Sequence, residues 1–238
     1  MHLYSQIENY ILDDIKSGKL TEGDMIPPET VLSKDFNVSR PTVRQALNNL
    51  VNEGYLVRIK GKGSFVTKPK IIQESTKFIE SYNAEMKKKG LIPKTLVLSM
   101  DIVEPNEMIK IKLNLKDNEK AIKLKRLRFV VSDKEEKPVL LTTVYIPYKL
   151  FPNLIMYDFE KHSLYDVLDQ NNLSVRKVIR EIEARGADSL TSKLLEINEG
   201  FPVHFINSIG FLESGEIIEY SESIYPSDRN KFVIEIVR

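Results

Sequence analysis

Side chains that can hydrogen-bond nucleic-acid bases are concentrated between residues 39 and 50 of this 238-residue sequence. They are Arg40, Arg44, Gln45, Asn48 and Asn49. Guanidinium and carboxamide groups pair with base edges and phosphate oxygens in a DNA major groove, so these residues could recognise DNA. A solvent-exposed helix face with no binding role carries similar side chains. The surrounding sequence is therefore needed to distinguish DNA recognition from such a face.

A predicted β-hairpin follows this stretch and carries positive charge of its own. Two β-rich runs, residues 55–60 and 64–67, flank Gly61-Lys62-Gly63, which predicts a turn with a lysine at its tip. Such a tip suits a minor groove. Residues 40–70 hold seven basic side chains and one acidic one, whereas residues 1–36 hold seven acidic and three basic. The net charge of +1 therefore hides a basic patch, which favours DNA binding over a solvated face.

Three predicted helices would position these side chains. The helix that carries the basic residues has an apolar face at i, i+3, i+4 and i+7, formed by Val43, Ala46, Leu47 and Leu50. Ser39 is a suitable N-cap for this helix, Pro41 fits its first turn and Gly54 fits its end. A first amphipathic helix precedes Gly18, and a second helix covers residues 29–36. Because the second and third helices are joined by a tight turn, the sequence predicts a helix-turn-helix, and the hairpin makes it winged.

Residues 1–68 resemble the N-terminal DNA-binding domain of GntR-family bacterial transcription regulators. The resemblance rests on the order of Gly23-Asp24, Pro27-Pro28-Glu29, residues 39–47, Gly54-Tyr55 and residues 61–66. It implies a DNA-binding set that consists of Glu29, Arg40, Thr42, Arg44, Gly61, Lys62 and Gly63. Pro28 stands where the family usually has a serine, which removes a capping hydroxyl from the second helix.

Residues 69–76 are polar, contain Pro69 and are predicted to link this domain to a second one over residues 77–238. A helix is expected from Phe78 to Gly90, and shorter helices at residues 107–113, 163–170 and 189–195. A period of two predicts strands at residues 95–103, 121–131, 139–146, 173–183, 203–212, 217–224 and 232–237, with turns at 133–137 and 213–216. The chain is therefore expected to be a two-domain α+β protein whose second domain has a mostly antiparallel sheet.

Arg126 and Arg128 are two residues apart on one predicted strand, so they point to the same face. Two guanidinium groups that converge on one spot need an anion, and phosphate or carboxylate fits their planar geometry. From these residues alone, it is equally possible that the two arginines lie on an exposed strand and that Glu135 and Glu136 balance their charge. Ser163 begins a predicted helix, where its hydroxyl could help to bind an anion or could simply cap the helix.

Residues 76–238 resemble UTRA, the effector-binding domain of the HutC subfamily of GntR regulators. The similarity rests on Arg126-Leu127-Arg128, residues 138–147, Ser163-Leu164-Tyr165, residues 219–225 and Asp228-Arg229. It implies a chorismate-lyase-like fold that binds a small phosphorylated or carboxylated metabolite, often a sugar phosphate. The pocket that it implies consists of Ser81, Arg126, Arg128, Thr142, Ser163, Glu219 and Tyr225. Thr142 stands where the family often has a glutamate.

The sequence offers little for several other functions. It has no cysteine, and its three histidines (His2, His162 and His204) lie far apart, so neither a metal site nor a cofactor is expected. It contains no glycine-rich phosphate loop or nucleophile elbow. No apolar run is long enough to cross a membrane and no signal peptide is evident, so the protein is expected in the cytoplasm.

The leading hypothesis is a ligand-responsive transcription regulator, a repressor of carbohydrate or related catabolic or transport genes. It is expected to act as a homodimer on a palindromic double-stranded operator, because one recognition helix reads too few bases for a unique site. One alternative is a DNA-binding head fused to a lyase-like enzymatic domain, although no nucleophile, base or metal cluster is recognisable. Another is a nucleoid-type binder with no ligand, which metabolites would not stabilise.

Overall fold

The computed structural model describes residues 3–67, 69–73, 79–131, 136–234 and 236. The chain divides into two compact units, Met1–Ile71 and Ile72–Arg238, and each has its own hydrophobic core. No helix in the described ranges is both long enough and apolar enough to cross a membrane.

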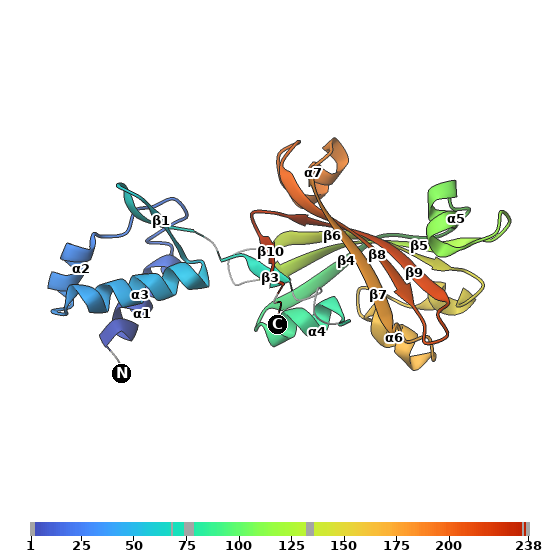
Figure 1. Cartoon of the computed structure of the whole chain (residues 1–238), viewed down its shortest axis with the longest axis horizontal. Helices are drawn as coiled ribbons and strands as arrows, with labels where there is room; N and C mark the ends of the chain where they lie inside the picture. Colours follow the sequence, from blue (N-terminus) through green and yellow to red (C-terminus); the bar gives the residue numbers. More distant parts are fainter. Residues whose placement is uncertain (1–2, 68, 74–78, 132–135, 235, 237–238) are drawn as a thin grey trace. The chain divides into compact units, whose positions relative to one another are not determined.

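The first unit contains three helices and a hairpin (Figure 1): α1 (Leu3–Ser17), α2 (Glu29–Asp35), α3 (Arg40–Glu53), β1 (Leu56–Ile59) and β2 (Gly63–Val66). Ser39 caps α3, and Gly54 ends it with a left-handed φ of 86°. Val43 and Leu47 on the apolar face of α3 join Ile7 of α1 in one buried core. The winged helix-turn-helix predicted from the sequence is confirmed.

The second unit is built on a six-stranded antiparallel sheet with the strand order β4-β5-β6-β9-β8-β7 (Figure 1). The strands are β4 (Ile92–Val103), β5 (Ala121–Val131), β6 (Glu136–Pro147), β7 (Lys177–Gly186), β8 (Pro202–Phe211) and β9 (Ile217–Pro226). Because β9 lies between β6 and β8, the register places Arg126, Thr142 and Ser223 in one row across three strands. Residues that are distant in the sequence thus share one face, as expected for an α+β domain.

Helices cover both faces of this sheet (Figure 1). They are α4 (Tyr82–Lys88), α5 (Glu107–Leu113), the 3-10 helix η1 (Pro152–Met156), α6 (Leu164–Gln170) and α7 (Ser189–Leu195). Leu164 of α6 packs in the same core as Leu124 of β5. Leu195 of α7 packs with Leu127, which points to the other face of β5. The face that carries Arg126 is therefore the one that α6 covers.

The segment predicted as a linker, residues 69–76, contains a strand in its described part. This strand, β3 (Ile71–Gln73), pairs with β10 (Asn230–Phe232). The Gln73 side chain donates a hydrogen bond to Asn230 Oδ1 at 2.7 Å, and Asn230 donates to the carbonyls of Val139 and Pro226 at 3.0 Å. Buried amides, rather than apolar periodicity, hold β3 in place.

Other element bounds also differ from prediction. The strand expected at residues 173–183 is β7, which runs from Lys177 to Gly186. The strand expected at residues 232–237 was wrong, because β10 (Asn230–Phe232) overlaps it only at Phe232 and residues 233 and 234 are not in a strand. The expected helix start at Phe78, the turn residues 133–135 and residue 237 lie outside the described residues.

Candidate DNA-binding face and effector pocket

The basic face predicted on α3 points to solvent. Four of the five side chains predicted to contact bases are exposed: Arg40, Arg44, Gln45 and Asn48. Ser39 accepts a hydrogen bond from the backbone N–H of Thr42 at 3.4 Å, and the two hydroxyl oxygens are 2.8 Å apart. Thr42 is thereby held at the first turn of α3. Asn49, predicted to share this face, instead donates to Glu8 of α1 at 2.7 Å.

Glu29 joins the recognition helix to the wing. Arg44 Nε donates to Glu29 Oε2 at 2.8 Å, and Arg58 Nη2 on β1 lies 3.8 Å from Glu29 Oε1. A carboxylate repels DNA phosphate, so this geometry suits orientation of the two arginines better than a direct phosphate contact. Arg58 was not predicted as a site residue, because no local pattern relates a strand arginine to Glu29.

Lys62 is exposed at the tip of the wing, between two glycines with left-handed backbone. Gly61 has a φ of 77° and Gly63 a φ of 126°. A Cβ at Gly63 would also lie 3.3 Å from the sulfur of Met25. Glycine at both positions allows the tight turn that presents Lys62 to solvent.

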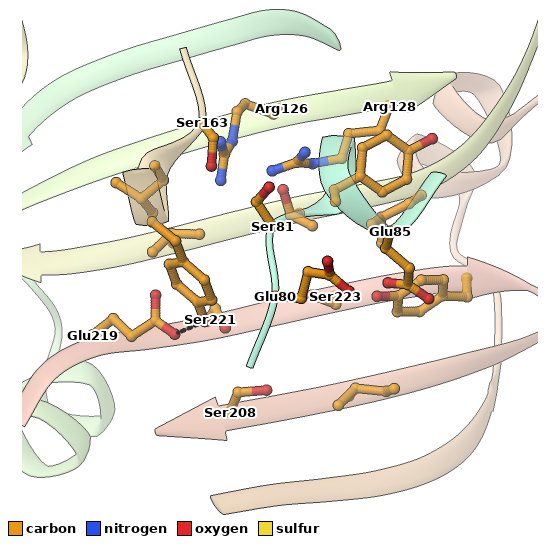
Figure 2. Close-up of a pocket in the computed structure, with 18 of the residues that line it drawn as sticks. Glu80, Ser81, Glu85, Arg126, Arg128, Ser163, Ser208, Glu219, Ser221 and Ser223 are labelled. Atoms are coloured by element: carbon orange, nitrogen blue, oxygen red, sulfur yellow. Dashed lines mark hydrogen bonds between the residues drawn. The ribbon is translucent and has the colours of Figure 1, made fainter. Parts of the chain in front are cut away.

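All seven residues predicted to bind an effector line one pocket of the second unit, which is partly open to solvent and has a cavity volume of about 110 Å³. They come from five places: Ser81 before α4, Arg126 and Arg128 on β5, Thr142 on β6, Ser163 before α6, and Glu219 and Tyr225 on β9. Figure 2 shows Ser81 and Ser163 beside the two arginines.

The two arginines bring positive charge into a buried place. Arg126 is 3% exposed, with its guanidinium 5.9 Å from the ring centre of Phe159, and Arg128 lies 4.7 Å from that of Tyr82. Burial lowers the pKa of both arginines, and the charge of Arg128 lowers the pKa of Arg126 further. Within the described part of the chain, Nε of each arginine and Oγ1 of Thr142 are buried without a hydrogen-bond partner. An anion would supply the acceptors that the two Nε–H groups lack.

Ser81 and Ser163 are both helix N-caps. Their hydroxyl oxygens accept hydrogen bonds from the backbone N–H groups of Ala84 at 3.3 Å and Asp166 at 3.4 Å. Capping accounts for both serines as structural residues. A hydroxyl that accepts such a bond can still donate its own proton to a ligand.

Glu219 contributes a buried carboxylate that is 2% exposed and accepts a hydrogen bond from the Tyr165 hydroxyl at 2.6 Å. Burial raises the pKa of Glu219, while the Tyr165 hydrogen bond and the charges of Arg180 and Arg126 oppose this rise. The Glu219 side chain lies across Gly210 of β8, where a Cβ would be 2.6 Å from Glu219 Cγ. A glycine at position 210 therefore makes room for the carboxylate.

Several polar residues of the pocket were not predicted from the sequence. They are Glu80, Glu85, Tyr165, Arg180, Ser208, Ser221 and Ser223. Ser221 and Ser223 had a usable signal, because alternation along β9 puts them on the face of Glu219. Arg180 and Ser208 reach the pocket only through the pairing of β7 with β8 and of β8 with β9. Across the described residues, no group of three or more His, Cys, Asp or Glu side chains could hold a metal ion.

Comparisons with known proteins match both units. Residues 3–66 match the family described as bacterial regulatory proteins, gntR family, and residues 88–231 match the UTRA domain. The chain is 31% identical to the HTH-type transcriptional repressor NagR of Bacillus subtilis (strain 168) over 232 residues, which cover 97% of this chain and 93% of NagR.

Two further similarities extend over nearly the whole chain. The mannosyl-D-glycerate transport/metabolism system repressor MngR of Escherichia coli (strain K12) is 27% identical over 98% of this chain and 95% of its own length. The crystal structure of PhnF from Mycobacterium smegmatis covers 99% of both chains at 23% identity with a TM-score of 0.83, which shows a common fold.

Both matched families and the curated relatives describe regulators, so the enzymatic alternative is set aside. Regulators of this kind bind DNA operators through the first domain and respond to small-molecule effectors through UTRA. The chain belongs to the GntR family of bacterial transcription regulators, with a UTRA domain after its winged helix-turn-helix.

Proposed function

We propose that this protein is a ligand-responsive repressor of the HutC type that controls carbohydrate or related catabolic or transport genes in the cytoplasm. Its effector is a small phosphorylated or carboxylated metabolite. The relatives support the first part, because one is named a transcriptional repressor and another a repressor of a sugar-conjugate transport and metabolism system.

The observation that carries the proposed effector class is the pair of buried arginines. Nε of Arg126 and Nε of Arg128 have no hydrogen-bond partner among the described residues. A buried cation without an acceptor is costly, and phosphate or carboxylate supplies both the counter-charge and paired oxygen acceptors. The anion would lie among Ser81, Ser163 and the arginines, while Glu219 and Tyr225 would face the polar remainder of the ligand.

The proposed active form is a homodimer on a palindromic operator. One copy of α3 presents few base-reading side chains, and a second copy on a symmetric half-site supplies the missing affinity and specificity. The half-sites are expected about one helical turn apart, or a small multiple of that spacing. DNA binding through Arg40, Thr42, Arg44 and the wing tip, with Glu29 orienting Arg44, is part of the same proposal.

The effector is proposed to act by favouring one arrangement of the DNA-binding units over another. A physical route starts at Glu85, which lines the pocket and lies 2.5 Å from Lys89 Nζ. Lys89 also donates a hydrogen bond to the carbonyl of Ile72 in β3, the strand that follows the first unit in sequence. The pocket and the segment that leads to the DNA-binding unit thus share a charged link.

Arg126→Met tests the proposed pocket. The substitution keeps a long side chain but removes a buried cation, so the domain should remain folded. Operator binding by the full-length protein is measured by fluorescence anisotropy on DNA from its own promoter, with and without sugar phosphates and sugar acids. At least one metabolite should change the operator affinity of the wild type, and the variant should need about 10-fold more of it.

Lys125→Met is the matched control, because residue 125 lies on the same strand and points to the opposite face. A variant at Arg126 that responds to the same metabolite concentration as the wild type would contradict the pocket assignment. A wild type that no anionic metabolite stabilises or shifts would favour a ligand-free binder instead.

A further inference from the structure

The pocket contains a polar group that a bound anion alone does not explain. Thr142 is 6% exposed, and its hydroxyl has no hydrogen-bond partner within the described ranges. The sheet register places it directly between Arg126 on β5 and Ser223 on β9. A buried unpaired hydroxyl is costly, so its position beside the arginine indicates that the body of the ligand contacts it.

Further hydroxyl groups extend this surface across the sheet. Ser221 on β9 and Ser208 on β8 are paired in register, and both are buried at the pocket wall. Figure 2 shows Ser208, Ser221 and Ser223 on strands across the pocket from the arginines. Each hydroxyl can donate one hydrogen bond and accept others. We call Thr142 and these three serines the hydroxyl floor; it matches the hydrogen-bonding pattern of a sugar or polyol.

Two carboxylates of the pocket are already neutralised by lysines of α4 and its C-cap. Lys88 Nζ lies 2.6 Å from Glu80 Oε1, and Lys89 Nζ lies 2.5 Å from Glu85 Oε1. The Glu85 side chain is only 7% exposed, so this ion pair is shielded from solvent. A cationic group on a ligand would have to displace a lysine from either carboxylate.

The third carboxylate is engaged as well. Glu219 accepts the Tyr165 hydroxyl at 2.6 Å and interacts favourably with the charges of Arg126 and Arg180. A ligand ammonium group would therefore meet no free carboxylate among the described lining residues, and it would lie near buried guanidinium groups. Repulsion between like charges is strong where water is excluded.

We infer that Thr142 and the hydroxyl floor select an effector whose anionic group is attached to an uncharged, hydroxyl-bearing body, and that the pocket disfavours an effector with an ammonium group. A neutral sugar or polyol phosphate fits this description, and an amino-sugar phosphate does not. This selection rests on the proposed function, because the anion must first be bound by Arg126 and Arg128.

Calorimetric titration of the full-length protein at neutral pH tests the selection with four probes: inorganic phosphate, glucose 6-phosphate, mannose 6-phosphate and glucosamine 6-phosphate. At least one of the two hydroxylated phosphates should bind more tightly than inorganic phosphate. Glucosamine 6-phosphate should bind about 10-fold or more weakly than glucose 6-phosphate, because its ammonium group meets no free carboxylate among the described lining residues and lies near the two guanidinium groups.

Thr142→Val removes the hydroxyl and keeps the shape of the side chain. The variant should bind the preferred sugar phosphate about 5- to 10-fold more weakly, which corresponds to one lost hydrogen bond, and should bind inorganic phosphate as the wild type does. Its melting temperature without ligand should equal or exceed that of the wild type, because an unpaired buried hydroxyl is gone. Thr143→Val on the opposite face is the control and should change neither affinity.

The outcomes separate the two levels of the proposal. If inorganic phosphate binds and Arg126→Met abolishes this binding, the anion site stands. Any of three results would then overturn the selection alone: glucosamine 6-phosphate binds as tightly as glucose 6-phosphate or more tightly, neither hydroxylated phosphate binds more tightly than inorganic phosphate, or Thr142→Val binds the sugar phosphate as the wild type does. If no phosphate compound binds, or if Arg126→Met does not weaken its binding, the proposed anion site is wrong and the selection falls with it.

Discussion

The arginines of the two units are prepared for binding in different ways. The Arg44 side chain is 61% exposed and is oriented by Glu29, so it keeps much of its hydration. Arg126 is 3% exposed and lies in a pocket where interactions are screened less by water and salt. DNA binding should therefore weaken steeply as salt rises, whereas effector binding should be less sensitive.

Arg40→Ala tests the base-reading role of α3. If Arg40 pairs with a guanine, its loss should cost about 1–3 kcal/mol of specific binding. A gel-shift titration against the operator measures the loss, and Lys16→Ala on α1 provides the charge-matched control. An operator affinity equal to that of the wild type would remove Arg40 from the recognition surface.

Glu29→Gln tests whether the carboxylate orients the arginines of the helix and the wing. The substitution removes a repulsive charge but releases Arg44 and Arg58, so affinity for random DNA should rise while preference for the operator falls about two- to fivefold. Competition of operator against random duplex measures this ratio. Glu22→Gln makes the same change of charge at an exposed loop position and should leave the ratio of operator affinity to random-DNA affinity unaltered. If Glu29→Gln also keeps the wild-type ratio, Glu29 does not orient the arginines.

At the scale of elements, Lys89 links the pocket wall to β3. At saturating effector, Lys89→Met should show a smaller effector-induced change in operator affinity than the wild type, because the link between Glu85 and the Ile72 carbonyl is lost. Anisotropy titrations at saturating effector measure this coupling. Lys87 is exposed on α4, and Lys87→Met is the control, which should show the same effector-induced change in operator affinity as the wild type. The same result for Lys89→Met would exclude this route.

Elements whose stability comes from local patterns were predictable from the sequence. The i, i+3, i+4, i+7 spacing, the Ser39 cap and the Gly54 stop marked α3, and they also predicted which side would be exposed. Alternation along β5 likewise predicted that Arg126 and Arg128 would point the same way, and the family resemblance added Glu219 and Tyr225 of β9 to their pocket. The structure places all of these side chains in one pocket.

Features set by distant pairing were not predictable in this way. β3 has three residues and depends on Asn230, which lies more than 150 positions further along the chain. Arg180 on β7 reaches the pocket only because β7 pairs with β8 and β8 with β9. Glu29 forms ion pairs with Arg44 on α3 and Arg58 on β1, which the sequence did not predict. In each case the residue or strand that sets the contact is distant in the sequence. The short-range spacing that predicts helices and strands gives no information about such contacts.

At the scale of the whole molecule, a net charge of +1 conceals two surfaces with separate tasks. The first unit concentrates its basic residues on α3 and the wing, where a polyanion can approach from solvent. The second unit places its arginines on the lining of a pocket. The division assigns sequence recognition to one domain and metabolite recognition to the other.

Competition binding on DNA from the protein's own promoter region tests this division most directly. At moderate salt, the full-length protein should prefer a palindromic duplex over random competitor by about 1,000-fold or more, with two chains bound to each duplex, and an anionic metabolite should change that preference. Equal affinity for the palindrome and for random DNA, with no effect of any metabolite, would contradict the account.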